Sequence, residues 1–372
     1  MTAPVYLDPR TSRTYPLDPP RWCGDDRAPL LVAPLPGIDR GAVRSEVPSL
    51  WRYAAALPFA PDAPITLGEG RTPLVARAAG GRTVLLKCEW MMPTGSFKDR
   101  GASVMLSLLR AQGIRRVLED SSGNGGASIA TYAAAGGLAA KILVPASTSP
   151  AKIVQARAAG AEIELVPGAR QDTTDEALRQ AERVFYASHA WHPFFLEGTK
   201  TLAYELWEDL GFRAPDVVVA PCGGGSNVLG CGIGFDELRR AGAIDAVPRI
   251  YAAQPAACAP IARAWLGAAP ADPAPTIAEG TAIAQPIRLP EVVDVLRRTG
   301  GGALMLEEDE IAHATLALAR TGVYVEPTSA QAFAALERLV TRGDVPRDAT
   351  CVVVLTGSGL KATARIAELV GP

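Results

Sequence analysis

From about residue 70 onward, short and nearly all-apolar runs alternate with longer alanine-rich amphipathic stretches. The short runs have the length of strands whose two faces are covered by helices, and the longer stretches repeat their apolar positions with helical spacing. Strands and helices that alternate in this way form mostly parallel sheets joined by right-handed crossovers. The chain is therefore expected to adopt an α/β fold with mostly parallel sheets.

The same pattern predicts the individual elements. Strands are expected at residues 84–88, 116–119, 141–144, 162–166, 216–220, 249–253 and 350–355. Helices are expected at residues 99–111, 127–135, 151–159, 175–188, 199–210, 228–240, 308–320 and 329–340. Residues 1–70 are rich in proline and poor in periodicity, which predicts an irregular arm or cap, and residues 268–275 predict an exposed loop or linker.

Length, charge and cysteine content limit the functional classes. A chain of 372 residues is long enough for about two domains, and its 37 basic and 39 acidic side chains give a net charge of -2. Without a cluster of lysine and arginine, the chain lacks the electrostatic footprint of a nucleic-acid-binding protein. Six cysteines without a repeated short spacing indicate free thiols, and neither a secretory signal nor an apolar run that could span a membrane is visible. We expect a cytoplasmic protein with no nucleic-acid and no membrane partner.

Glycine-rich turns follow three of the expected strands. Their sequences are Ser-Ser-Gly-Asn-Gly-Gly at 121–126, Gly-Gly-Gly-Ser-Asn at 223–227 and Thr-Gly-Ser-Gly at 356–359. A fourth segment, 93–101, places Lys98 at the start of an expected helix. In α/β sheets, ligands bind beyond the carboxyl ends of the strands, where such turns lead into helix N-termini. The four segments together therefore predict a ligand site.

The turn at 223–227 is a candidate phosphate cradle. Its three glycines let backbone N–H groups converge without Cβ atoms in the way, and the helix dipole behind them favours an anion. A tight strand-to-helix turn without a ligand is the structural alternative. Neither the spaced-glycine dinucleotide motif nor the P-loop motif is present in the sequence, which disfavours nicotinamide and nucleoside triphosphate cofactors.

Lys98 is a candidate for a lysine that forms a Schiff base. The positive end of the helix dipole disfavours an ammonium ion at this position, and a neutral amine reacts with an aldehyde. Considered alone, Lys98 is better explained as a solvated lysine at a helix end. Its combination with the three turns reverses that preference.

In this order, the lysine, the asparagine turn, the triple-glycine turn and the terminal hydroxyl turn resemble the fold-type II pyridoxal-phosphate-dependent enzymes of the tryptophan synthase beta superfamily, most closely the threonine synthase branch. The resemblance runs through residues 51–53, 67–74, 87–89, 93–101, 326–330 and 356–361. It implies two three-layer α/β/α domains with pyridoxal 5'-phosphate in the cleft between them, and a homodimer. The expected limits are 1–92 for the N-terminal arm and the start of the large domain, 93–198 for the small domain, and 199–372 for the remainder of the large domain.

The resemblance also implies roles for single residues. Lys98 would hold the cofactor through a Schiff base and would then act as the base that removes the Cα proton of the substrate. Asn124 would bind the phenolic oxygen of the cofactor, and Thr356 would bind its pyridine nitrogen. The cofactor phosphate would lie against Gly223, Gly224, Gly225, Ser226 and Asn227. The amino-acid substrate would contact Ser121, Ser122, Gly123, Gly125, His189 and Phe195.

A hydroxyl group at Thr356 has a chemical consequence. A carboxylate beside the pyridine nitrogen would keep that nitrogen protonated and make the ring a deep electron sink, whereas a neutral hydroxyl does so much less. A shallow sink favours prompt loss of a β-substituent over transamination or decarboxylation. The expected reaction is therefore elimination or replacement at the β-carbon of an L-amino acid.

One stretch departs from the threonine synthases. Those enzymes usually carry Asn-Ser and then Arg before a Leu-Glu-Gly segment, whereas in this chain His189-Ala190 and Phe195 hold these positions. Phenylalanine cannot replace the bidentate phosphate clamp of an arginine. The stretch therefore disfavours O-phosphohomoserine and favours an apolar, aromatic or β-hydroxy side chain. Trp191, Phe194 and Phe195 would contact that side chain, unless they are core residues.

The expected function is therefore that of a pyridoxal-phosphate-dependent lyase of the dehydratase or ammonia-lyase type, acting on a β-hydroxy amino acid. Threonine synthase, acting on O-phosphohomoserine, is one alternative. A catalytically inert regulator that keeps the fold is another, and it would not need both Lys98 and Asn124. We do not expect a metal site, because His189 and His192 have no third imidazole and no cysteine cluster near them in the sequence.

Overall fold

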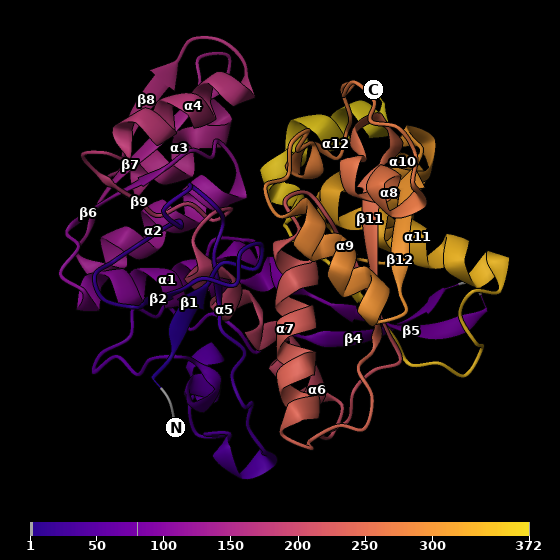
Figure 1. Cartoon of the computed structure of the whole chain (residues 1–372). Coiled ribbons are helices and arrows are strands. Elements are labelled where there is room, and N and C mark those ends of the chain that lie inside the picture. The colour runs from indigo at the N-terminus through magenta and orange to yellow at the C-terminus, as the bar shows by residue number, and fades with distance from the viewer. Residues whose placement is uncertain (1–2, 80, 372) are drawn as a thin grey trace. The chain divides into compact units, whose positions relative to one another are not determined.

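The computed structural model describes residues 3–79 and 81–371, which form two compact units (Figure 1). Unit 1 comprises the described residues up to Pro36 together with Ala42–Gly70 and Lys98–Thr201. Unit 2 comprises Gly37–Gly41, the described residues of Arg71–Phe97, and the described residues from Leu202 onward. The chain therefore passes from unit 2 to unit 1 between Phe97 and Lys98, and returns between Thr201 and Leu202.

Unit 1 is built on a four-stranded parallel sheet. In spatial order, its strands are β8 (Glu162–Val166), β7 (Ala139–Pro145), β6 (Arg116–Glu119) and β9 (Phe185–Tyr186). Its helices are α1 (Lys98–Ala111), α2 (Asn124–Gly136), α3 (Pro150–Ala158), α4 (Arg170–Gln180) and α5 (Pro193–Thr199). Helices α2 and α3 pack together on the sheet, α4 packs on β6, β7 and β8, and α1 packs on α2 and α5 (Figure 1). Since β6 runs directly into α2, the carboxyl end of β6 lies next to a helix N-terminus.

The N-terminal arm of unit 1 is more regular than its proline content suggests. It forms a small antiparallel sheet in the order β2 (Thr14–Pro16), β1 (Val5–Leu7) and β3 (Leu31–Val32). Tyr6 is fully buried, and its ring lies 5.9 Å from that of Phe194 on α5. The arm is therefore part of the core of unit 1, and the expectation of an irregular arm is wrong for these three strands.

Unit 2 is built on a six-stranded sheet in which every neighbouring pair is parallel except the pair at one edge. In spatial order, its strands are β12 (Gly302–Leu306), β11 (Arg249–Pro255), β10 (Val217–Pro221), β13 (Cys351–Val354), β5 (Arg82–Lys87) and the antiparallel β4 (Leu74–Ala79). Its helices are α6 (Thr201–Asp209, whose first residue belongs to unit 1), α7 (Ser226–Arg240), α8 (Pro260–Leu266), α9 (Leu289–Arg298), α10 (Glu308–Arg320), α11 (Pro327–Arg342) and α12 (Thr363–Val370).

Helices form two layers on the sheet of unit 2. Helix α9 packs on α7 and α8, and these three helices contact strands of the set β10 to β12, whereas α10 packs on α11 and α11 packs on β10, β11 and β13 (Figure 1). All residues of β10 and β13 are buried, as expected for valine-rich strands between two helical layers. Short 3-10 helices complete the chain: η1 (Arg40–Ala42), η2 (Leu50–Ala56), η3 (Glu89–Met91), η4 (Ala256–Cys258), η5 (Glu279–Thr281) and η6 (Gly359–Ala362).

The structure confirms the α/β class and most of the expected elements. Strands β6 and β8 and helix α10 have the expected bounds, and residues 268–275 form an exposed stretch without helix or strand. The helix expected at 175–188 is wrong in its second half, because α4 ends at Gln180 and β9 pairs with β6. The β-branched and aromatic residues at 184–186 suit a strand better than a helix. No helix among the described residues is both long and apolar enough to cross a membrane.

A buried ion pair ties strand β5 to helix α6 in unit 2. Lys87 Nζ on β5 lies 2.7 Å from Glu205 Oε1 and 2.6 Å from Asp209 Oδ2, both on α6. The side chains of Lys87 and Glu205 are 0% and 1% exposed. The Glu205 carboxylate also accepts hydrogen bonds from the backbone N–H groups of Arg71 and Thr72, each at 2.8 Å. Removing the ammonium would therefore leave a buried carboxylate without its counter-charge.

We expect Lys87→Met to lower the free energy of unfolding by about 3 kcal/mol, because an uncompensated buried charge is costly. Arg116→Met is the control, since Arg116 pairs with Glu162 at 2.6 Å with both side chains about half exposed. Such a surface pair contributes less than about 1 kcal/mol. Urea unfolding of both variants measures the difference, and equal losses would contradict the importance of burial.

Candidate active site

In unit 1, the first candidate turn joins β6 to α2. Strand β6 ends at Glu119, and α2 begins at Asn124, with Ser121 and Ser122 half-buried in the turn. A Cβ atom at Gly126 would collide with the carbonyl oxygen of Ser121, so the first turn of α2 lies directly against the turn that precedes it. The N–H groups of a first helical turn have no acceptor within their helix. The turn therefore presents backbone donors and hydroxyl groups at one place, as an anion or carboxylate site requires.

His189 lies against this turn and is held by a buried carboxylate. Its Nδ1 lies 2.9 Å from Glu119 Oε1, and its backbone N–H donates to Glu119 Oε2 at 2.9 Å. A Cβ atom at Gly125 would lie 2.8 Å from His189 Nδ1 and 3.0 Å from Ser121 Oγ, so the imidazole rests on the glycine. Glu119 is completely buried, whereas the His189 side chain is 17% exposed. The carboxylate therefore fixes the orientation of a partly accessible ring.

Phe195 connects His189 with Lys98. Lys98 is the first residue of α1 and is half-buried, and its Nζ lies 5.4 Å from the centroid of the Phe195 ring. The same ring lies 5.8 Å from that of His189 in an edge-to-face arrangement. A Cβ atom at Gly101 would lie 2.5 Å from Phe195, which shows how closely α1 covers the ring. Unit 1 thus brings Lys98, Phe195, His189 and Gly125 into one continuous row of contacts.

A buried hydrogen bond fixes the starts of the two helices that carry Lys98 and Asn124. The Ser128 hydroxyl on α2 donates to Asp99 Oδ1 on α1 at 2.7 Å, and both side chains are fully buried. Asp99 follows Lys98 in the chain, and Ser128 lies one helical turn after Asn124. The N-termini of α1 and α2 are therefore held in register.

In unit 2, the triple-glycine turn joins β10 to α7. Gly225 has a φ of +90°, and a Cβ atom there would collide with Val292 on α9. A Cβ atom at Gly223 would lie 3.1 Å from the Cα of Thr281, whereas one at Gly224 would meet nothing within 4 Å. Glycine is therefore required at position 225, both for its positive φ and for the close contact with Val292. At Gly224, in contrast, the turn is open.

Polar atoms without partners lie beside this turn. The Asn227 side chain on α7 is 2% exposed, and neither its Oδ1 nor its Nδ2 has a hydrogen-bond partner among the described residues. On α11, Gln331 is fully buried; its Nε2 donates to Thr281 Oγ1 at 2.9 Å, but its Oε1 has no partner within the described part of the chain. Buried polar groups are normally satisfied, so these amide atoms are available to hydrogen-bond a ligand.

The last candidate turn follows β13 in unit 2. Thr356 is 2% exposed, and its Oγ1 lies 3.1 Å from Ser329 Oγ at the start of α11. Ser329 Oγ also accepts a hydrogen bond from Gly357 N at 2.8 Å. The carbonyl oxygen of Thr356 accepts a hydrogen bond from Phe97 N at 3.0 Å, and Phe97 is the residue that precedes Lys98. The hydroxyl of Thr356 is thus positioned by a second hydroxyl.

Two of the aromatic residues expected near the substrate lie elsewhere. The Trp191 ring lies 5.5 Å from that of Trp22 in the N-terminal arm, and Phe194 is fully buried against Tyr6 and Phe59. Phe194 is therefore a core residue, as in the alternative interpretation, whereas Trp191 is half-buried against the arm. Phe195 is fully buried as well, and of the three aromatic residues it is the one that contacts Lys98 and His189.

Sequence reasoning missed two residues that position others. Glu119, which holds His189, carries a weak signal as a carboxylate at the end of an apolar strand and just before the Ser-Ser turn. Ser329, which holds Thr356, lies in the segment 326–330 that carried part of the family resemblance. Neither signal indicates which side chain each residue contacts, since the partners are distant in the sequence.

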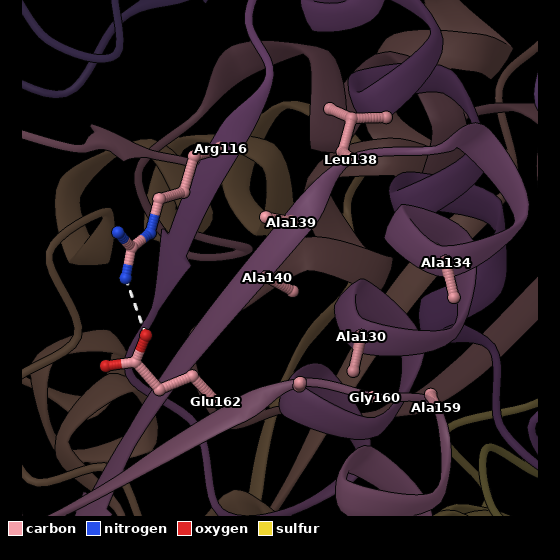
Figure 2. Close-up of a pocket in the computed structure, with 10 residues that line it drawn as sticks. Arg116, Ala130, Ala134, Leu138, Ala139, Ala140, Ala159, Gly160 and Glu162 are labelled. Atoms are coloured by element: carbon pink, nitrogen blue, oxygen red, sulfur yellow. Dashed lines mark hydrogen bonds and ion pairs between the residues drawn. The ribbon is translucent and has the colours of Figure 1, made fainter.

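A cavity of about 290 Å³ in unit 1 lies away from all these residues (Figure 2). It lies at the amino ends of β6, β7 and β8, where Arg116 and Glu162 form an ion pair at 2.6 Å. Its other lining residues are alanine, glycine and leucine. The candidate turn at 121–126 follows the carboxyl end of β6, where ligands of α/β sheets bind, so this cavity is not the candidate site.

Comparison with known proteins identifies the family of this chain. Residues 65–357 match the family described as pyridoxal-phosphate dependent enzyme. The chain is 34% identical over 337 residues to threonine synthase of Methanosarcina acetivorans, an alignment that covers 87% of this chain and 83% of that protein. It is 37% identical over 318 residues to threonine synthase of Mycobacterium tuberculosis, covering 83% and 87%.

A solved structure shares the fold. The processed form of threonine deaminase isoform 2 from Solanum lycopersicum superimposes with a TM-score of 0.69 at 22% identity, covering 80% of this chain and 82% of that chain. The family match extends over most of the sequence and includes Lys98, Asn124 and the triple-glycine turn. The chain therefore belongs to the pyridoxal-phosphate-dependent enzymes, in their threonine synthase-like, fold-type II branch.

Proposed function

We propose that this protein is a pyridoxal-phosphate-dependent lyase that removes or replaces the hydroxyl group at the β-carbon of an amino acid such as threonine or serine. The observation that carries the choice of substrate is the buried Glu119–His189 pair, which lies beside Phe195 where threonine synthases usually carry an arginine. A cytoplasmic location and a homodimeric state belong to the proposal as expectations from the sequence.

In each unit, residues of the candidate site have properties that suit a bound pyridoxal phosphate. In unit 2, the buried Asn227 amide has no hydrogen-bond partner among the described residues, and the glycine turn is open at Gly224, where a phosphate group could approach. Ser96 Oγ is also fully buried without a partner among the described residues. Burial raises the pKa of the adjacent Cys222 thiol to about 12, so no thiolate competes with a phosphate dianion there. In unit 1, Lys98 supplies the amine.

We assign the following roles to the residues of this chain. When bound, pyridoxal phosphate would supply an electron sink for negative charge at Cα. Lys98 is the amine that would hold the cofactor aldehyde and would accept the Cα proton. Asn124 binds the phenolic oxygen, Ser226 and Asn227 bind the phosphate with the three glycines of the turn, and Thr356 donates or accepts a hydrogen bond at the pyridine nitrogen.

The hydroxyl group of Thr356 and the carboxylate site at the start of α2 determine which bond of the substrate breaks. Ser329 positions the Thr356 hydroxyl, and an uncharged hydroxyl does not hold a proton on the pyridine nitrogen as a carboxylate would. Charge at Cα is then best relieved by loss of a substituent from the β-carbon. Ser121, Ser122, Gly123 and the first N–H groups of α2 bind the substrate carboxylate, and this places the β-substituent beside the side chains that contact Gly125.

The charge around His189 favours a neutral β-substituent over a phosphorylated one. A phosphate carries about two negative charges and needs guanidinium or ammonium partners. At the position of the family's arginine, this chain has the apolar Phe195, and the ring of Phe195 contacts an imidazole that is bound to the carboxylate of Glu119. The Glu119 carboxylate beside this imidazole would repel a phosphate. A β-hydroxyl group carries no such cost.

Threonine synthase activity is the second candidate, favoured by one observation. The chain is 34% and 37% identical to the threonine synthases of Methanosarcina acetivorans and Mycobacterium tuberculosis over more than four-fifths of its length. If the chain acts on O-phosphohomoserine, its phosphate group must be held by residues other than the missing arginine.

Reduction with borohydride should fix the cofactor on Lys98 alone among the six lysines of the chain. Lys87 and Lys200 are fully buried in ion pairs with Glu205 and Glu197, which leaves their amines engaged. After the yellow protein has been reduced, peptide mass spectrometry locates the lysine that carries the adduct. Lys98→Ala should be colourless, whereas the exposed control Lys152→Ala should stay yellow. An adduct on another lysine would refute the assignment.

Asn227→Ala should separate cofactor binding from stability. Because neither amide atom has a partner within residues 3–79 and 81–371, the unloaded variant should lose less than about 1 kcal/mol of unfolding free energy, while the dissociation constant of pyridoxal phosphate should rise about tenfold. Gln254→Ala is the control: this buried amide donates to Cys222 O and accepts from Ala262 N, each at 2.9 Å, and its loss should cost about 2 kcal/mol. Urea unfolding and cofactor titration measure both quantities. A large stability loss with unchanged affinity would contradict a phosphate role.

A substrate panel tests the proposed reaction directly. The loaded enzyme should release a keto acid and ammonia from L-threonine or L-serine, and no phosphate from O-phospho-L-homoserine. Coupled assays for keto acid and for inorganic phosphate report the two reactions in parallel. Release of phosphate with formation of threonine would establish the second candidate instead. Cofactor binding without turnover of any amino acid would indicate an inert regulator.

A further inference from the structure

We propose that His189, positioned by Glu119, donates the proton with which the β-hydroxyl group leaves the substrate. This inference rests on the proposed function, because it assigns a role within the same elimination reaction. His189 is the catalytic residue in this step, and Glu119 is a positioning residue that acts through it.

The hydrogen bonds of His189 determine what its ring can do. Glu119 is a carboxylate at the ring and accepts from Nδ1 at 2.9 Å, so Nδ1 carries a proton. Nε2 lies on the opposite edge of an imidazole ring, away from that carboxylate. When the ring is protonated, Nε2–H is its second donor, and the buried Glu119 stabilises the positive charge. The backbone N–H of His189 also donates to Glu119, so one carboxylate holds the residue at two points.

The ring lies next to the proposed substrate position. The ring lies on Gly125 and near Ser121 Oγ in the turn that we assign to the substrate carboxylate. Phe195 covers another edge, and the ring of Phe195 has Lys98 Nζ 5.4 Å from its centroid. The amine that takes the Cα proton and the imidazole are thus separated by one aromatic side chain. A substrate with its carboxylate at 121–125 and its Cα at Lys98 presents its β-carbon to this row of contacts.

The adjacent carboxylate, Asp120, does not share this role. Its Oδ1 accepts from the Tyr186 hydroxyl at 2.7 Å, and its Oδ2 pairs with Arg170 and accepts from Thr174, each at 2.8 Å. Burial, together with the charges of Asp120 and Glu119, raises the pKa of Tyr186, so its hydroxyl stays protonated as the donor. Asp120 is therefore occupied by structural partners, and Glu119 is the carboxylate that serves His189.

A hydroxyl leaving group creates the need for such a donor. When the Cα–H bond breaks, its proton passes to the Lys98 amine and its electron pair forms the new bond between Cα and Cβ. The Cβ–O bond breaks with its pair on oxygen, the proton on His189 Nε2 joins that oxygen, and water leaves. The ring regains a proton from solvent or from the Lys98 ammonium. A positioned acid of this kind contributes about 100-fold to 10,000-fold in rate.

A comparison of two leaving groups tests the role of His189. L-Serine and β-chloro-L-alanine differ only at the β-substituent, and chloride departs as a stable anion that needs no proton. His189→Gln should therefore lower kcat for L-serine by about 100-fold or more and change kcat for β-chloro-L-alanine by less than about threefold. Glu119→Gln should lower kcat for L-serine selectively, and by less. His313→Gln, which replaces an exposed histidine on α10, is the control and should change neither rate.

The test uses the ratio of kcat for L-serine to kcat for β-chloro-L-alanine within one variant. This ratio does not depend on the fraction of the protein that is folded or loaded with cofactor. Cofactor absorbance and the melting temperature show whether each variant is intact. Equal losses for both substrates in His189→Gln and in Glu119→Gln would overturn the inference and leave the proposed function standing, since elimination would still occur. A wild-type enzyme that releases a keto acid from neither substrate would instead overturn the proposed function, and the inference with it.

Discussion

The close approach of α1 and α5 is the contact on which the candidate site of unit 1 depends. A Cβ atom at Gly198 would collide with the backbone of α1, and one at Gly101 would lie 2.5 Å from the Phe195 ring. Because both positions lack a side chain, the two helices can pack at a short distance. Phe195 then lies directly beneath Lys98, and its edge reaches His189. A larger residue at either glycine would displace the ring and, with it, the amine and the imidazole.

The candidate residues could be selected from the sequence because they lie at the ends of regular elements. Lys98 begins α1, Asn124 begins α2 and Ser226 begins α7, each within three residues of the helix starts expected at 99, 127 and 228. Local sequence does not reveal pairings between distant segments. Glu119 and His189 are 70 residues apart, and only the fold of unit 1 brings them together. Likewise, the strands of the proline-rich arm were not expected, so the sequence could not identify Tyr6 as the partner against which Phe194 is buried.

The chain shares its fold with threonine synthases but differs in the groups around the expected β-substituent. Its only two asparagines, Asn124 and Asn227, both lie within two residues of a glycine turn of the candidate site. In the proposed function these two residues bind the cofactor, whereas His189 and Phe195 lie near the substrate. On that proposal, a change of substrate could be confined to one short segment while the cofactor groups stay in place.

The unpaired amide atoms of Asn227 and Gln331 have a consequence beyond catalysis. A protein without its cofactor bears the desolvation cost of these groups inside unit 2, whereas a ligand that hydrogen-bonds to them removes that cost only in the folded chain. Binding to the native state alone raises its stability with the logarithm of ligand concentration. The supply of vitamin B6 in a cell would then set how long this enzyme survives heat and proteolysis, in addition to how fast it works.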